Sequence, residues 1–229
     1  MGHKGFSVTN NIEIMKTLKV PKIEVSENTQ FDNIINILDE KGERHIIDTL
    51  NWAKEYPYKP LSSFTIAHDG KYIYIDFFVR CNYLKAVNYE NNSPVSQDSC
   101  VEFFVAPKCD NHYWNFEFNC IGTINASHRT ERKKPTRLND VELAQVLRYA
   151  SCGNKPFQEL EGIFSWNLLV AIPLSLIGIE YNGTPIAMKG NFYKCASGCS
   201  QPHYMSWNPI HTDKPDFHRQ EFFGDIILA

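Results

Sequence analysis

The sequence lacks long apolar runs: no stretch of its 229 residues approaches the ~20 apolar residues of a membrane-spanning helix. Residues 1–5 also lack the apolar core of a secretion signal. Basic residues cluster only at 129–137, and the net charge is −3. Because binding to a phosphate backbone depends on clustered Lys and Arg, we expect a soluble chain that binds neither nucleic acid nor membranes. Its compartment stays open, since a mature secreted fragment would look the same.

Motifs of the common enzyme and metal classes are missing as well. There is no glycine-rich phosphate loop, no G-x-S-x-G turn and no H-E-x-x-H pair. The seven cysteines are odd in number and irregularly spaced, which predicts reduced, buried thiols rather than a disulfide framework. Cys195, Cys199 and His203 are zinc-type ligands, but their spacing is loose and a fourth ligand is missing. We therefore expect neither a metal nor a cofactor.

Short alternating segments bounded by turn residues predict an all-β fold. Residues 63–68 and 72–79 form the clearest hairpin, because Asp69-Gly70 between them supplies the positive φ angle of a tight turn. No linker or long repeat divides the sequence. We predict an antiparallel β-sandwich of the immunoglobulin-like or jelly-roll type, with one domain at 16–229 after an arm at 1–15. Further strands are expected at residues 20–25, 98–105, 113–119, 165–172, 186–194 and 222–228.

Three segments show helical rather than alternating spacing. Residues 31–38 place their apolar side chains on one helical face, which predicts a short helix. Residues 141–149 fit a helix or a strand equally well, and both remain open. Residues 174–179 predict a single helical turn between strands. The sandwich is therefore expected to contain one or two short helices.

Two aromatic-rich segments, residues 98–105 and 113–119, are the most informative part of the sequence. Side chains alternate between the two faces of a strand. If the segments pair, Phe103 and Phe116 share an apolar face, and Glu102, Glu117 and Asn119 lie on the opposite side. Acids and amides are poor strand formers. Their position therefore indicates a sheet face that contacts solvent or a ligand.

Three motifs resemble those of carbohydrate-binding module family 9. The run Asp98-Ser99-Cys100-Val101-Glu102-Phe103-Phe104-Val105 is similar to its DSVE(I/F)F(V/I)D signature. Trp166-x-x-x-Val170-x-Ile172-Pro173 resembles its YxVExxIP strand. Ser206-Trp207-Asn208-Pro209, followed by Phe223-Gly224-Asp225, resembles its SWSDP…FGxLxL ending. The likeness spans about Val20 to Leu228 and favours a family-9-like, DOMON-like branch of sandwiches.

The resemblance implies a non-catalytic module that binds a glycan or its terminal sugar. Such modules usually accompany a glycoside hydrolase in polysaccharide utilisation. The family holds its sugar between two tryptophans above a polar sheet face. Trp207 matches one tryptophan, but the other falls at Val95. Glu102 matches the glutamate of that face, while Glu117 and Lys194 stand where the family has arginine and glutamine.

Several other residues are candidates for the carbohydrate site. The missing second ring could be replaced by Trp52, Tyr56 or Tyr193, and Asn119 extends the polar face. Trp114 and Trp166 alternate with core residues, so both are expected to pack inside. The predicted carbohydrate-binding set is Trp207, Glu102, Glu117, Lys194, Asn119, Tyr193 and Trp52.

The run Asp216-Phe217-His218-Arg219 has no clear assignment from sequence alone. Its aromatic side chain is expected to pack where the last strand enters the sheet. We expect Arg219 to pair with Asp216 or with Glu221, rather than to reach the rim of the site beside Trp207.

Two other functions remain open. Glu102 and Glu117, if directly opposite, would have Cβ atoms ~5 Å apart, which suits the close carboxyl pair of a retaining glycosidase. An open sheet face, however, would leave both carboxyl groups with ordinary pKa values and no division into acid and nucleophile. The resemblance to related haem-binding sandwiches also makes His203 and Met205 candidate axial ligands. We favour the binding module.

Overall fold

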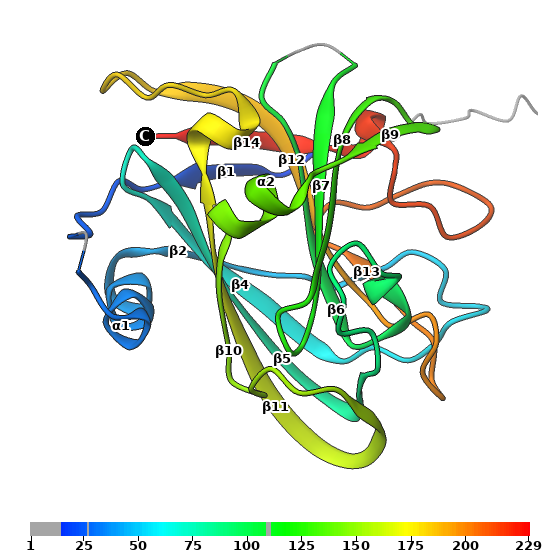
Figure 1. Ribbon diagram of the computed structural model, residues 1–229. Coiled ribbons are helices and arrows are strands. Elements are labelled where there is room, and N and C mark those ends of the chain that lie inside the picture. Colours follow the sequence, from blue (N-terminus) through cyan, green and yellow to red (C-terminus); the bar gives the residue numbers. More distant parts are fainter. Residues whose placement is uncertain (1–14, 27, 109–110) are drawn as a thin grey trace, which may run out of the picture.

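The computed structural model describes residues 15–26, 28–108 and 111–229, and it confirms the predicted all-β sandwich. Two sheets lie face to face, and the first and last strands run side by side in one of them (Figure 1). Except for Met15, the predicted arm at 1–15 lies outside the described residues, and the single domain at 16–229 stays a prediction. Within the described ranges, no helix is long and apolar enough to cross a membrane.

The smaller sheet has five antiparallel strands, in the order β10 (Leu147–Ala150), β11 (Phe157–Pro173), β5 (Tyr72–Ala86), β4 (Leu61–His68) and β2 (Glu43–Ile46). Its β4–β5 hairpin turns at Asp69-Gly70 as predicted, with a φ of 90° at Gly70. The Asp69 carboxylate accepts hydrogen bonds from the backbone N–H groups of Lys71 and Tyr72. These bonds close the turn locally.

The larger sheet has nine strands. Its main path is β1 (Thr17–Val20), β14 (Gly224–Leu228), β12 (Ile186–Cys195), β6 (Cys100–Ala106), β7 (Tyr113–Asn119), β8 (Ile124–Glu131) and β9 (Lys134–Arg137). Off this path, β13 (Tyr204–Ser206) pairs with β12 and with β3 (Thr49–Leu50). All of these pairings are antiparallel except β1 with β14, which is parallel.

The strand predicted at residues 20–25 is misplaced. The observed strand, β1, ends at Val20, and only an isolated bridge from Lys22 to His68 follows it. Pro21 explains the difference, because proline has no N–H group to donate to a strand ladder.

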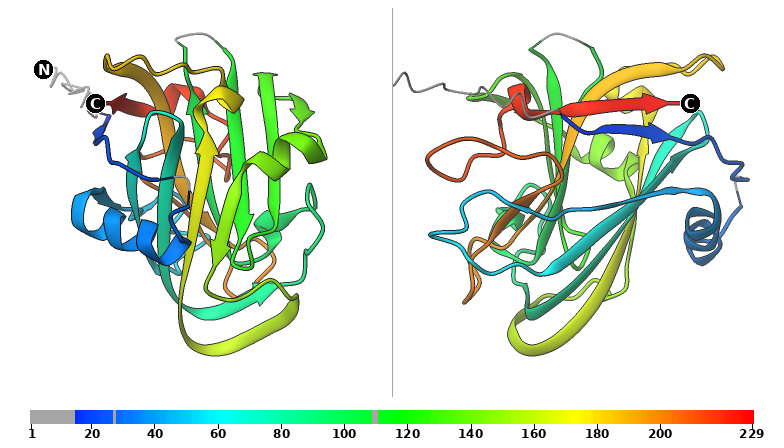
Figure 2. Two further views of the ribbon diagram at one scale, coloured as in Figure 1. Left: turned by 60° about the vertical axis from the view of Figure 1, so that its left-hand side comes forward. Right: turned by 180° about the vertical axis from the view of Figure 1, so that it is seen from behind.

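The helical segments agree with the spacing of their apolar residues. The predicted helix is α1 (Phe31–Lys41), which lies outside the five-stranded sheet and buries Ile34 and Leu38 against it (Figure 2). The ambiguous segment contains both alternatives, since α2 (Asp140–Gln145) is capped by Asn139 and leads into β10. The predicted turn is the 3₁₀ helix η2 (Leu174–Ile177), and two more 3₁₀ turns are η1 (Val95–Gln97) and η3 (Gln220–Phe222).

An aromatic column joins the two sheets. Strands β6 and β7 pair antiparallel, and Phe103 and Phe116 lie inside as predicted, directly opposite each other and fully buried. The Phe103 ring stacks on Phe192 of β12, with centroids 4.8 Å apart. Phe192 in turn stacks on Phe64 of the smaller sheet, with centroids 3.7 Å apart. The apolar face of the central hairpin therefore forms the middle of the core.

Replacing Phe103 with Ala should lower the free energy of unfolding by ~3–5 kcal/mol, as expected for a fully buried ring that leaves a cavity. Denaturant melts followed by circular dichroism measure the change. Tyr89→Ala is the control, because Tyr89 is 64% exposed and surface changes usually stay within ~0.5 kcal/mol. A loss below ~1 kcal/mol for Phe103→Ala would contradict the assigned core.

Candidate functional site

The outward face of the nine-stranded sheet carries the polar row predicted from the sequence. Glu102 of β6 lies directly opposite Glu117 of β7, and Tyr193 of β12 lies opposite Glu102 on its other side. Because opposite residues in a ladder share a face, these three side chains form one row across the middle of the sheet.

This face is covered rather than open. Phe217, in the segment between β13 and β14, stacks on Tyr193 with ring centroids 4.2 Å apart and an interplanar angle of 9°. The Tyr193 hydroxyl donates to the Phe217 carbonyl oxygen over 3.1 Å. The next residue, His218, packs on Phe104 and is hydrogen-bonded through Nδ1 to the Tyr113 hydroxyl at 3.1 Å. Phe104, Tyr193 and Phe217 belong to a second hydrophobic cluster.

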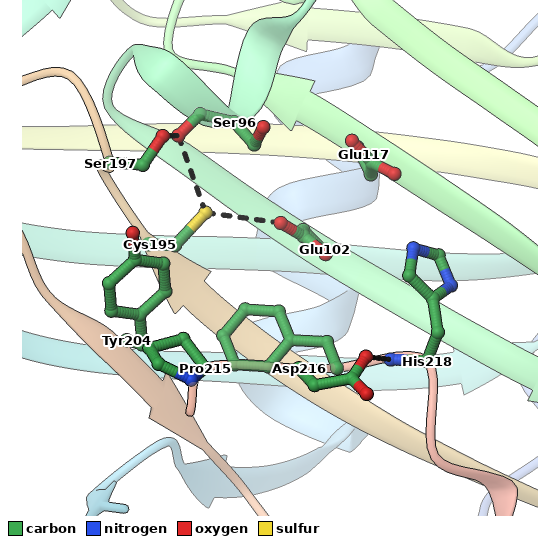
Figure 3. Close-up of a pocket in the computed structure, with 10 residues that line it drawn as sticks. Ser96, Glu102, Glu117, Cys195, Ser197, Tyr204, Pro215, Asp216 and His218 are labelled. Atoms are coloured by element: carbon green, nitrogen blue, oxygen red, sulfur yellow. Dashed lines mark hydrogen bonds between the residues drawn. The ribbon is translucent and has the colours of Figure 1, made fainter. Parts of the chain in front are cut away.

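A cavity of about 270 Å³ remains between the sheet and this covering segment. The carboxyl groups of Glu102 and Glu117 lie on its sheet side, and Tyr204 and His218 lie on opposite sides of them (Figure 3). Its walls come from six separate parts of the chain. The lining residues are Ser96, Glu102, Glu117, Cys195, Ser197, Tyr204, Pro215, Asp216, Phe217 and His218.

Amide groups hold the Glu117 carboxyl group in place. The Nδ2 atoms of Asn115 and Asn125 donate to its two oxygens over 2.9 and 3.0 Å. Arg129 donates from Nε to Asn115 Oδ1 over 2.8 Å and so fixes that amide. Burial raises the pKa of Glu117, although the two amide hydrogen bonds and the nearby Arg129 charge partly offset this effect.

Thiols, rather than amides, are the hydrogen-bond donors to Glu102. The Cys195 thiol donates to Glu102 Oε1 over 3.1 Å, and Cys100 Sγ lies 3.8 Å from the same oxygen. Burial raises the pKa of Glu102 well above its usual value, and electrostatic interactions with the neighbouring Cys195 and Glu117 raise it further. The expectation of an open face with unshifted carboxyl groups is therefore wrong, because the covering segment removes both groups from water.

In the wild type, ionisation of the buried Glu102 should lower the free energy of unfolding as pH rises. The Glu102→Gln variant should lack this loss. The pKa of Glu102 is higher in the folded than in the unfolded chain, so its stabilising effect is complete below pH ~4.5 and is lost as pH rises through the folded-state pKa. Above pH ~4.5, the variant should gain on wild type by up to ~1.4 kcal/mol per pH unit.

Urea unfolding across a pH series, in the presence of a chelator, measures this difference. Glu90→Gln, at an exposed position, is the control, and its curve should run parallel to that of wild type. A constant offset between Glu102→Gln and wild type at every pH would contradict the raised pKa.

Ion pairs anchor the covering segment. The Asp216 carboxylate lies 2.6 Å from an Arg132 guanidinium nitrogen and 2.7 Å from Arg219 Nε, and Arg219 also reaches Glu221 at 3.5 Å. These contacts confirm the structural pairing expected for Arg219. Burial lowers the pKa of His218 to about 3, with a further contribution from the Arg129 charge, so His218 is a neutral wall of the cavity.

The expectation of a sugar platform at Trp207 is corrected. Trp207 is fully buried in the core between the sheets, edge-on to Phe64 and Phe192. Its Nε1–H donates to His45 Nδ1 over 3.3 Å. A ring without exposed surface cannot stack on a sugar, so Trp207 is a core residue. Trp166, at 1% exposure, is core as predicted.

Lys194 is also on the other side of the sheet from the cavity. It stands opposite the inward-facing Val101, whereas its neighbour Tyr193 faces outward. Its Nζ donates to the Cys195 carbonyl oxygen over 2.7 Å and contacts His203 Nε2 at 3.0 Å. Lys194, which the sequence predicts as part of the carbohydrate-binding set, therefore lies outside the outward row.

Trp52, Asn119 and Tyr193, which were predicted to bind the sugar, do not line the cavity. Trp52 is 5% exposed, and its Nε1–H donates to the Thr212 carbonyl oxygen over 2.7 Å. Asn119 accepts hydrogen bonds from the backbone N–H groups of Ile121 and Thr123 and so shapes the turn after β7.

Trp114 is partly buried and stacks on His128, in line with its predicted packing role.

Sequence reasoning missed most of the cavity wall. Tyr204, Phe217 and His218 were not assigned to the site, and neither were Ser96, Ser197 and Cys195. The available signal was the run 215–219, whose aromatic and charged residues stand apart from the strand pattern. What it could not reveal is that this run folds back over the sheet.

Comparisons with known proteins agree with this architecture. The profile of carbohydrate-binding family 9 matches residues 32–228, and the chain therefore belongs to this family. The crystal structure of a proposed carbohydrate-binding protein from Bacteroides uniformis is 36% identical, with a TM-score of 0.89 over 93% of this chain and 99% of that one. No curated protein matches the chain.

Two further solved structures share the fold at lower identity. Both are family 9 carbohydrate-binding modules from Caldicellulosiruptor kristjanssonii, one in complex with glucose and one with cellotriose. Each is 16% identical to this chain and covers 93% of it, and the matches span 96% and 93% of those chains with TM-scores of 0.58 and 0.56.

Proposed function

We propose that this chain is a non-catalytic carbohydrate-binding module whose ligand occupies the cavity above Glu102 and Glu117. The observation that carries the proposal is the combination of two buried carboxyl groups with aromatic walls in a member of carbohydrate-binding family 9. Ligand sites are typically apolar with a few well-placed polar groups. The glucose and cellotriose bound by the two Caldicellulosiruptor modules support a carbohydrate ligand.

Tyr204 is the aromatic surface that we assign to the sugar in place of Trp207. It lines the cavity and is only partly buried. Tyr56 packs edge-on against it with centroids 4.8 Å apart, and Trp52 packs edge-on at 6.2 Å. A ring held on two sides is a preorganised surface for the C–H groups of a sugar, which lowers the entropy lost on binding.

Polar groups around this ring suit sugar hydroxyls. Glu117 is oriented by two amides, and Ser96 and Ser197 add polar groups to the same cavity. The cavity of about 270 Å³ falls just below the ~300–1,000 Å³ typical of drug-sized ligands. This volume favours one terminal sugar over a longer internal segment, and we propose that the module serves polysaccharide utilisation in this way.

One observation favours a second candidate, a retaining glycoside hydrolase. Glu102 and Glu117 are directly opposite, and burial raises the pKa of both. Against it, amide hydrogen bonds occupy both Glu117 oxygens, and a thiol occupies one Glu102 oxygen. A retaining glycosidase keeps one carboxyl group ionised as the nucleophile beside a protonated acid, whereas burial raises the pKa of both groups here. We therefore place binding first.

A glycan array followed by a reducing-sugar assay on the best ligand separates the two functions. We expect saturable binding with no release of sugar above the buffer rate. Binding without hydrolysis supports the module. Sugar release that is abolished in both Glu102→Gln and Glu117→Gln would replace it with the hydrolase, and no binding to any glycan would overturn the proposal.

A further inference from the structure

Three metal-ligating side chains meet beneath the cavity. Cys100 and Cys195 lie directly opposite in the β6–β12 ladder, and Glu102 is two residues from Cys100 on the same face. One ligand atom from each residue lies within 4.8 Å of the other two. The structure thus brings together two thiols and a carboxyl group that are far apart in the sequence.

We propose that Cys100, Glu102 and Cys195 bind a zinc ion. Thiolate sulfur and carboxylate oxygen are both zinc ligands, at ~2.3 and ~2.1 Å, so tetrahedral geometry places such atoms ~3.6–3.8 Å from one another. The observed distances from Glu102 Oε1 are 3.1 Å to Cys195 Sγ and 3.8 Å to Cys100 Sγ. Only small side-chain movements are needed to bring all three atoms into one coordination sphere.

The site has access for the ion and room for a fourth ligand. Glu102 and Cys195 line the cavity, while Cys100 lies behind them and is fully buried. Zinc sites with three protein ligands take a water molecule or a bound ligand in the fourth position. Here that position opens on the cavity.

The carboxyl group of the trio, that of Glu102, is buried without an ion-pair partner among the described residues. The three groups ligate a metal only when deprotonated. Zinc stabilises the deprotonated forms, so binding releases protons and strengthens with rising pH.

The proposed zinc ligands differ from the set considered in the sequence analysis, which was Cys195, Cys199 and His203. His203 Nε2 contacts Lys194 Nζ at 3.0 Å on the inner side of the sheet, whereas the Cys195 thiol points outward to Glu102. The zinc proposal rests on the trio alone and does not depend on carbohydrate binding. If zinc is bound, it occupies Glu102 and leaves Glu117 for ligand hydroxyls.

Co²⁺ and Zn²⁺ titrations of the reduced full-length chain test the proposal. One equivalent of Co²⁺ should produce a thiolate-to-metal absorbance band, and Zn²⁺ should displace it. Cys100→Ser and Cys195→Ser should each lower zinc affinity by more than ~100-fold, since even changes behind the ligands cost ~10–100-fold. Cys152→Ser is the matched control, because its thiol contacts Cys120 and not the trio, and affinity should be unchanged.

Two results would overturn the proposal. One is the absence of the absorbance band after full reduction of the chain. This result would also overturn the proposal if Cys100 and Cys195 form a disulfide in the purified protein and bind no metal after it is reduced. The other is a band that survives in both Cys100→Ser and Cys195→Ser. Thermal melts of each variant in chelator show that the comparison is made between folded chains.

Discussion

Trp207→Ala is expected to lower the free energy of unfolding by ~3–5 kcal/mol, the cost of truncating a fully buried aromatic ring. The ring fills space between the sheets beside Phe64 and Phe192. Loss of its indole N–H would also leave His45 Nδ1 without a hydrogen-bond donor. The packing is tight, since a Cβ atom placed on Gly224 would lie 2.8 Å from Trp207 Cζ3. Denaturant melts of the variant and wild type measure the loss.

A conservative variant separates stability from binding at this position. Trp207→Phe should keep the fold and bind the glycan found on the array with wild-type affinity, because the ring faces the core rather than the cavity. Trp114→Ala, at a partly buried tryptophan, should cost less stability than Trp207→Ala. A folded Trp207→Phe that no longer binds glycan would restore Trp207 to the site.

Tyr204→Ala should weaken glycan binding by about 30-fold or more, which corresponds to a hot-spot loss of ~2 kcal/mol. The reason is its position, since Tyr204 lines the cavity and keeps part of its ring surface exposed. Its partial burial should make the stability cost smaller than that of Trp207→Ala. Isothermal titration calorimetry with the glycan, beside thermal melts, measures both effects.

Tyr89→Ala is the matched control for this experiment. Tyr89 is 64% exposed and lines a separate groove together with Arg148 and Tyr149. Its removal should leave affinity unchanged. If Tyr89→Ala abolishes binding and Tyr204→Ala does not, the sugar site lies in that second groove.

Local alternation was sufficient to predict the central part of the fold. The pairing of residues 98–105 with 113–119, with Phe103 opposite Phe116 and Glu102 opposite Glu117, follows from the two-residue period and from the burial of aromatic side chains. The Asp69-Gly70 hairpin and α1 likewise carry their signals within a few residues. The parallel pairing of β1 with β14 has no such signal, because it joins the two ends of the chain.

The candidate site could be predicted only in part. A motif match places Trp207 near the site in sequence but does not show on which side of the sheet its ring lies. Lys194 illustrates the same point, since a shift of one residue from Tyr193 moves a side chain to the opposite face. The covering segment was missed because Phe217 reaches Tyr193 through a loop. The covering segment buries Glu102 and so raises its pKa, and this effect depends on the tertiary structure.

We expect carbohydrate to bind in the cavity between the sheet and the covering segment. A crystal structure of the chain in complex with the glycan selected on the array is the direct test of this claim. We expect a terminal sugar ring against Tyr204, with a hydroxyl group hydrogen-bonded to Glu117. A sugar bound in the groove beside Tyr89, or on any surface outside the cavity, would contradict the claim.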